Sequence, residues 1–132
     1  MNSRAVVAGH GDFAAGVISA VTQISGRDDV FVGFSNRDLS AQEVERTLRE
    51  QVEASRSTVI FTDLPAGSCA MAARRLQREH PELIVVMGAS VATLLEFVFA
   101  EDCGDLDAAR HAAEKGRQAI VTTGGVTPGG GA

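Results

Sequence analysis

Short apolar runs alternate with segments of helical periodicity along most of this chain, and that alternation restricts the possible folds more than any other feature. Each run has four or five residues and is rich in Val, Ile and Phe, which is typical of buried strands. The predicted strands are Ala5–Ala8, Val30–Phe34, Thr58–Thr62 and Leu83–Met87. Strands that alternate with helices form a parallel sheet with helices on both faces, so we expect an open, doubly wound α/β fold.

The helices are predicted from apolar residues three or four positions apart and from residues that begin or end helices. Ser40 and Glu43 have the spacing of a capping box, and Asp105 is expected to cap the last helix. The predicted helices run from Phe13 to a stop at Gly26, onward from Ser40, and over Ser68–Glu79, Val91–Phe99 and Asp105–Lys115.

A length of 132 residues suits one domain with a single core. We expect this domain to cover residues 1–123 and to include a fifth strand over Gln118–Thr123. The Gly-rich segment 124–132 has too little apolar surface to pack, so we expect it to be a flexible tail.

Charge and composition exclude several classes of function. The net charge of -5 argues against nucleic acid as the main partner, because phosphate binding needs a basic face. No apolar run reaches the roughly 18 residues that a membrane helix needs, and the start of the chain does not resemble a signal peptide. Cys69 and Cys103 are too few and too poorly spaced for a disulfide framework or a metal site. These features indicate a cytoplasmic protein.

His10 stands between Gly9 and Gly11, where the first predicted strand ends, and Asp63 ends the third. In doubly wound sheets, ligands bind beyond the carboxyl ends of the strands, where the winding reverses. If strands one and three are neighbours there, the imidazole and the carboxylate meet. The sequence therefore predicts a His–Asp pair at this edge.

Such a pair suits nucleophilic catalysis. Asp63 would accept a hydrogen bond from Nδ1–H of His10, which leaves the lone pair of Nε2 facing outward, and it would stabilise the positive ring that forms on attack. A nucleophilic His can carry a phosphoryl group. Gly67 and Ser68 open a helix and would supply backbone N–H groups and a hydroxyl to its oxygens, as would Gly11 at the first helix.

Each of these residues is more common in a structural role when taken alone. A strand-end Asp is often a turn former, and a lone His is often a surface or core residue. Their coincidence at the strand ends of one fold favours a site. An alternative of another class is a non-catalytic α/β module, in which helix N-termini bind a small anion and His10 only donates a hydrogen bond.

The chain resembles the enzyme IIA domains of the mannose-type sugar phosphotransferase system. The resemblance is carried by GHGDFAAG at residues 9–16, by FTDLPAGS at residues 61–68 and, more weakly, by the segment Val85–Phe99. The sequences GHGDFAAG, TDLPAGS and LLEFVFAE are most similar to those of the galactosamine and N-acetylgalactosamine branch.

The resemblance implies four parallel strands in the order 2-1-3-4 and an added antiparallel strand exchanged between the chains of a homodimer. It also implies phosphoryl relay: His10 would accept the group from the phosphohistidine carrier HPr and pass it to a sugar-specific enzyme IIB. His10 matches the phosphorylated position, Asp63 its orienting carboxylate and Ser68 a phosphoryl contact. No metal, nucleotide or other cofactor is implied, and membrane association would occur only through the transporter complex.

The sequence departs from the family pattern at two loops. The family loop G-G-[ST]-P is here Ala66, Gly67, Ser68 and Cys69, and Ser90 stands where the family has an asparagine in a G-x-N pattern. These departures leave open two related functions with the same chemistry: phosphoryl relay to a dihydroxyacetone kinase, and a regulatory module that reports phosphorylation state.

Overall fold

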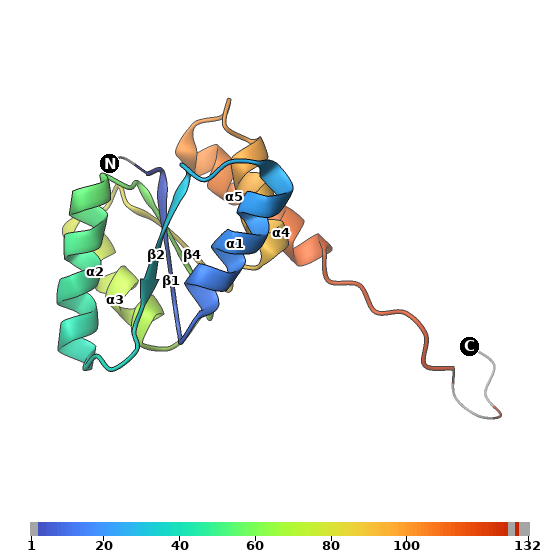
Figure 1. The fold of residues 1–132 in the computed structure, drawn as a ribbon, viewed down its shortest axis with the longest axis horizontal. Helices are drawn as coiled ribbons and strands as arrows, with labels where there is room; N and C mark the ends of the chain where they lie inside the picture. Colours follow the sequence, from blue (N-terminus) through green and yellow to red (C-terminus); the bar gives the residue numbers. More distant parts are fainter. Residues whose placement is uncertain (1–2, 127–128, 130–132) are drawn as a thin grey trace.

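The computed structural model describes residues 3–126 and 129, and within these residues the chain forms four strands and five helices (Figure 1). The strands are β1 (Ala5–Gly9), β2 (Phe31–Ser35), β3 (Val59–Thr62) and β4 (Ile84–Met87). The helices are α1 (Phe13–Ser25), α2 (Ala41–Ser55), α3 (Ser68–Glu79), α4 (Val91–Phe99) and α5 (Asp105–Gln118).

All strand pairs are parallel, and the order across the sheet is β2-β1-β3-β4. The predicted fold and strand order are thereby confirmed. The central strand β1 pairs with both β2 and β3, with Ala8 beside Phe34 on one side and Thr62 on the other. The residues that follow β1, β2 and β3 therefore emerge at one edge of the sheet.

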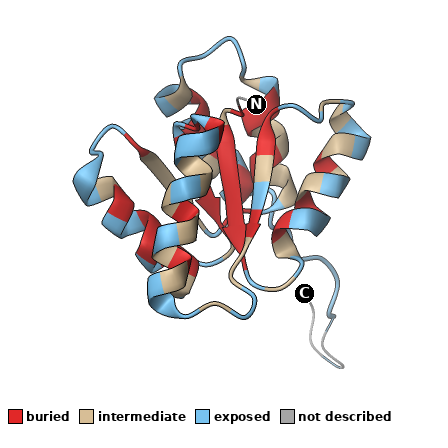
Figure 2. Ribbon diagram, turned by 60° about the vertical axis from the view of Figure 1, so that its left-hand side comes forward, coloured by how far each residue is buried: buried red, intermediate tan, exposed pale blue. Residues whose placement is uncertain are grey.

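Helices cover both faces of the sheet and enclose two apolar layers. Helices α1, α4 and α5 lie on one face and α2 and α3 on the other, as Figure 1 shows. The first layer is centred on Phe31, Phe61 and Phe97, whose ring centroids lie 5.1 to 6.0 Å apart. Figure 2 shows the fully buried central strands β1 and β3 between half-exposed helices. This double burial explains the nearly continuous apolar runs of the sequence.

The helix ends follow the local signals closely. The predicted capping box is confirmed: the Glu43 backbone N–H donates to Ser40 Oγ, and the Ser40 backbone N–H donates to the Glu43 carboxylate. Gly26 ends α1 in the left-handed conformation, as predicted. A second capping box, which we did not predict, joins Ser90 and Thr93 at the start of α4. Ser90 therefore has a structural role here.

Two expectations for the last helix are wrong: the residue that caps it and the residue at which it ends. Asp105 does not cap α5, because Gly104 is the N-cap; its carboxylate instead accepts hydrogen bonds from the Arg4 guanidinium at 2.9 and 3.2 Å. The helix also continues past Lys115 to Gln118. The fifth strand expected over Gln118–Thr123 is not seen in the single chain, where residues 119–126 form no strand, and it stays a prediction. A strand needs a hydrogen-bonding neighbour, and this segment extends away from the body (Figure 1).

The predicted flexible tail, residues 124–132, lies mostly outside the described residues. Within the described part of the chain, none of the helices is long and apolar enough to span a bilayer.

Candidate active site

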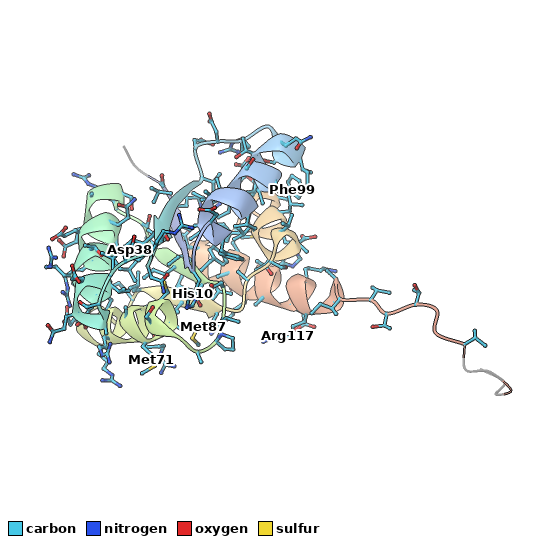
Figure 3. The ribbon with its side chains drawn as sticks, turned by 60° about the horizontal axis from the view of Figure 1, so that its bottom comes forward. His10, Asp38, Met71, Met87, Phe99 and Arg117 are labelled. Carbon is cyan, nitrogen blue, oxygen red and sulfur yellow. The ribbon has the colours of Figure 1, made fainter. Side chains whose placement is uncertain are left out.

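His10 and Asp63 meet at the edge of the sheet where the strands end. His10 follows β1 directly and Asp63 follows β3, and these two strands are neighbours. His10 Nδ1 lies 2.7 Å from Asp63 Oδ2, and the same oxygen accepts the His10 backbone N–H at 2.9 Å. Figure 3 looks toward this edge and shows His10 among side chains from several elements. The structure therefore brings together two residues that are 53 positions apart in the sequence.

The electrostatics of the pair determine the state of the imidazole. Partial burial of Asp63 would raise its pKa, but hydrogen bonds from the backbone and ring of His10, together with the ring's charge when protonated, outweigh this effect and hold the pKa below its usual value. An ionised carboxylate only accepts hydrogen bonds, so Nδ1 carries the proton and Nε2 of the neutral ring carries the lone pair. The His10 side chain is 51% exposed and that of Asp63 only 13%, so the ring is accessible while its partner is covered.

The two glycines beside His10 allow this contact. A Cβ atom on Gly9 would lie 2.7 Å from a ring carbon of Phe13 and 3.1 Å from Asp63 Cγ, so a side chain here would displace the carboxylate. Gly11 has a φ of 52°, in the left-handed region that glycine adopts readily. Its carbonyl accepts a hydrogen bond from the Ser35 hydroxyl at 2.9 Å, which ties the turn to the end of β2.

Gly67 places the start of α3 against the imidazole. A Cβ on Gly67 would lie 3.2 Å from His10 Cε1 and 3.7 Å from Nε2, and the φ of this residue is 112°. Gly67 is the N-cap of α3 and no side chain caps this helix. The first backbone N–H groups of α3 are thus left without helical partners close to Nε2, where they form a favourable environment for an anion.

Ser68, the first residue of α3, is held by a residue that sequence reasoning missed. Asn36 Nδ2 donates a hydrogen bond to Ser68 Oγ at 2.7 Å. Asn36 follows β2, and its backbone N–H donates to the Gly9 carbonyl at 3.1 Å. A signal was available: with β2 next to β1, the polar residues after β2 emerge at the same edge. Arg37 also lies there and pairs with Asp12 at 3.0 Å.

Cys69 takes no part in this arrangement. The side chain packs in the apolar layer beneath α2 and α3, and the residue is 1% exposed. Burial raises the pKa of its thiol to about 11, and the negative charge of Asp63 adds to the effect. A buried thiol of this kind is inert and packs as a small apolar residue.

The fold and the site define an open α/β domain with an oriented, solvent-accessible histidine beside an uncapped helix N-terminus. The chain matches the family model described as "PTS system fructose IIA component" over residues 4–130. It therefore belongs to this mannose-type enzyme IIA family of the sugar phosphotransferase system, and the resemblance seen in its motifs is confirmed at the level of the family. A phosphotransferase activity is implied for the family in general.

Solved structures share this fold. A phosphotransferase system component EIIA from Streptococcus agalactiae has a TM-score of 0.79 and 21% identity, with 92% of this chain and 97% of that chain covered. A mannose/sorbose-specific IIA subunit from Enterococcus faecalis has a TM-score of 0.78 and 20% identity, with 97% and 99% covered. A sigma-54 interaction domain protein from Enterococcus faecalis has a TM-score of 0.63 and 18% identity, with 86% and 88% covered. No curated protein sequence matches the chain significantly.

Proposed function

We propose that this protein is a cytoplasmic phosphoryl carrier of a sugar phosphotransferase system, with His10 as the residue that is phosphorylated. His10 accepts the group from phosphorylated HPr and passes it to a sugar-specific enzyme IIB. The observation that carries this proposal is the 2.7 Å contact of Nδ1 with Asp63, which leaves Nε2 as the nucleophile beside Gly67.

The transfer is an in-line displacement at phosphorus. The Nε2 lone pair forms the new N–P bond while the P–N bond of the donor breaks, and that electron pair returns to the donor's ring nitrogen. Nδ1 keeps its proton throughout, and Asp63 stabilises the positive charge that the ring acquires. The N–H groups at the start of α3, the Ser68 hydroxyl and the turn at Gly11 stabilise the charge on the phosphoryl oxygens. Catalysis is thus mainly positioning and electrostatic stabilisation.

The test is phosphorylation in a reconstituted system. Incubation with phosphoenolpyruvate, enzyme I and HPr is expected to add one acid-labile phosphoryl group of about 80 Da, measured by intact-protein mass spectrometry. His10→Ala should abolish the gain. The other two histidines provide matched controls: His80→Ala and His111→Ala change exposed residues outside the site and should leave the gain unchanged. Label that persists in His10→Ala would overturn the assignment.

A non-catalytic anion-binding module would share the free N–H groups at α3. It would bind inorganic phosphate reversibly, and no mass would be added in the reconstituted system. The same experiment therefore separates the two classes of function.

We further propose that the enzyme IIB partner belongs to the galactosamine and N-acetylgalactosamine branch. The support is the sequence of residues 9–16, 62–68 and 94–101. Transfer of label from phosphorylated His10 to purified IIB proteins of this branch and of the mannose branch tests the assignment, which fails if the mannose-type protein is the better acceptor.

A regulatory module is a second candidate. The likeness of the fold to a sigma-54 interaction domain protein and the altered loop at Ala66 and Cys69 favour it. A regulatory module would accept the phosphoryl group on His10 but would retain it when IIB is added, whereas a transport relay would lose it.

We also propose that the protein is a homodimer in which residues 119–123 of each chain pair with β4 of the other. Among the strands of the described residues, β4 is bonded to β3 alone, and its other edge faces a groove of about 640 Å³ between α3 and α5. Ile120 and Val121 are 83% and 75% exposed in the single chain. An open strand edge and an apolar extended segment are the two halves of a strand-addition interface.

A further inference from the structure

We propose that Asn36 is a positioning residue for phosphoryl transfer, acting through Ser68. Its side-chain amide holds the Ser68 oxygen so that the hydroxyl proton is available to a phosphoryl oxygen on His10. The proposal rests on the proposed function of His10 and assigns a role to a loop outside the sequence motifs.

Asn36 is fixed in place by its own backbone. Its N–H donates to the Gly9 carbonyl at 3.1 Å, which continues the pairing of β2 with β1, and its carbonyl accepts the Leu39 N–H at 3.1 Å. The residue is half-buried. With both main-chain groups bonded, the side chain has a defined origin, and Nδ2 reaches Ser68 Oγ at 2.7 Å.

This hydrogen bond determines what the Ser68 hydroxyl can do. A hydroxyl has one proton and two lone pairs. Because the Asn36 amide donates to Oγ, one lone pair is occupied, and the proton remains available to an acceptor elsewhere. Among the described residues, no carbonyl or carboxylate accepts this proton; the hydroxyl interacts only with the neighbouring Cys69 sulfur, which is a weak acceptor that a phosphoryl oxygen would replace. Ser68 directly follows Gly67, whose backbone borders the Cε1–Nε2 side of the imidazole, so a phosphoryl group on Nε2 would provide that acceptor.

The same loop also holds the turn that follows His10. The Ser35 hydroxyl donates to the Gly11 carbonyl, and the Arg37 N–H donates to Ser35 Oγ at 3.2 Å. Residues 35–37 thus contact both segments that are expected to surround the phosphoryl group. A loop with this placement positions the two donors relative to each other as well as to His10.

Two substitutions separate this role from a structural one. Asn36→Ala removes the donor, and the phosphoryl transfer rate at saturating phospho-HPr should fall about three- to tenfold, with KM for phospho-HPr unchanged. Asn36→Asp keeps the shape but can only accept, so Ser68 would donate to it and the added charge would repel the phosphoryl group. The loss should therefore be larger for Asp than for Ala. If Asn36 had only a structural role, Asn36→Ala should lose more transfer rate than Asn36→Asp. The same order would be found if the oxygen of the Asn36 amide, and not its nitrogen, faced Ser68.

A double-mutant cycle tests whether Asn36 acts through Ser68. Ser68→Ala should slow transfer, and adding Asn36→Ala in that background should cause no further loss. Ser57→Ala is the control for general destabilisation, because it removes the buried hydrogen bond from the Ser57 hydroxyl to the Ser3 carbonyl, at the end of the strands opposite the site; it should lower the unfolding midpoint but not the transfer rate. Equal losses from Asn36→Ala in both backgrounds, or none in either, would overturn the role of Asn36 while His10 remains the phosphorylated residue. If the wild-type chain takes no phosphoryl group, the proposed function fails and this role fails with it.

Discussion

At the scale of single residues, one carboxylate oxygen of Asp63 accepts two hydrogen bonds that have different effects. Oδ2 accepts the backbone N–H of His10, which fixes the turn, and Nδ1–H, which fixes the tautomer. The imidazole is therefore oriented by its main chain and its ring together. An orienting residue of this kind affects catalysis and stability through the same hydrogen bonds, and the two effects can be measured separately.

Asp63→Asn should slow phosphoryl transfer more than tenfold, because a neutral amide stabilises the charged ring poorly and can favour the wrong tautomer. It should also cost about 1–3 kcal/mol in the free energy of unfolding at pH 7, since the hydrogen bonds to a charged acceptor are lost.

The stability cost should depend on pH. The folded state lowers the pKa of Asp63, so its carboxylate contributes stability above the ordinary value of about 3.9, and this contribution is lost as the pH falls through the lowered pKa. Urea unfolding at pH 7 and pH 3 should show a difference between wild type and Asp63→Asn that narrows at pH 3. A difference of equal size at both pH values would contradict the hydrogen-bond geometry.

At the scale of elements, the sequence carries most of the information on strands and helices and little on the contacts between distant segments. The apolar runs fix β1 to β4 within one or two residues, because a strand buried on both faces has few alternatives. The extension of α5 to Gln118 was missed, since Gln118 to Thr123 also suits a strand and the glycine that directly follows Lys115 is typical of a helix end, although Gly116 lies within the helix. The His10–Asp63 pair could be predicted because both residues end neighbouring strands. Asn36 could not be assigned to Ser68, because a hydrogen bond between the side chains of a loop residue and the first residue of α3 leaves no periodic pattern.

The packing of α4 against α5 depends on a glycine. A Cβ atom on Gly116 would overlap Thr93 Oγ1 and would lie 3.3 Å from Thr93 Cβ. Thr93 is 4% exposed and is bonded to Ser90 in the capping box of α4, so it has little freedom to move away. The close approach of the two helices therefore requires the absence of a side chain at this position.

Gly116→Ala should lower the free energy of unfolding by about 1–3 kcal/mol, because the overlap outweighs the gain in helix propensity. Gly16→Ala is the matched control, as Gly16 lies in α1 and a Cβ there meets nothing within 4 Å. It should raise the free energy by up to about 1 kcal/mol. Denaturant unfolding of both variants measures the effect, and a stabilised Gly116→Ala protein would show that α4 and α5 are packed less tightly than the structure has them.

At the scale of the whole molecule, the two ends of the strands have different roles. The edge where the strands end carries His10, Asp63 and the start of α3. At the opposite end of the strands, the side chain of Arg4 is paired with Asp105 of α5 and lies 4.3 Å from the centroid of the Phe97 ring. This contact joins the start of β1 to the last two helices. The site can therefore stay open to solvent, because contacts of Arg4 at the other end of the strands hold β1, α4 and α5 together.

The edge of β4 that does not face β3 leads to the last prediction. Each strand residue spans about 3.3 Å, so residues 119–123 are long enough to pair with the four residues Ile84–Met87 of a second chain. In sedimentation experiments the full chain should have twice the 13.8 kDa mass of the monomer. Removal of residues 119–132 should give a monomer, whereas removal of 125–132 should leave the dimer intact.

The site supplies an independent check on the same variants. His10, Asp63, Gly67 and Ser68 come from one chain, so the shortened monomer should still accept a phosphoryl group on His10. A chain without residues 119–132 that remains dimeric would show that another surface forms the interface, and a monomeric full chain would overturn the dimer itself. Loss of phosphorylation in a folded monomer would mean that the second chain contributes to the site. Such a contribution has a route, because Pro65 lines the groove beside β4 and belongs to the same loop as Asp63 and Gly67. In that case this loop, which contacts both the groove beside β4 and the imidazole of His10, would couple dimer assembly to phosphoryl transfer.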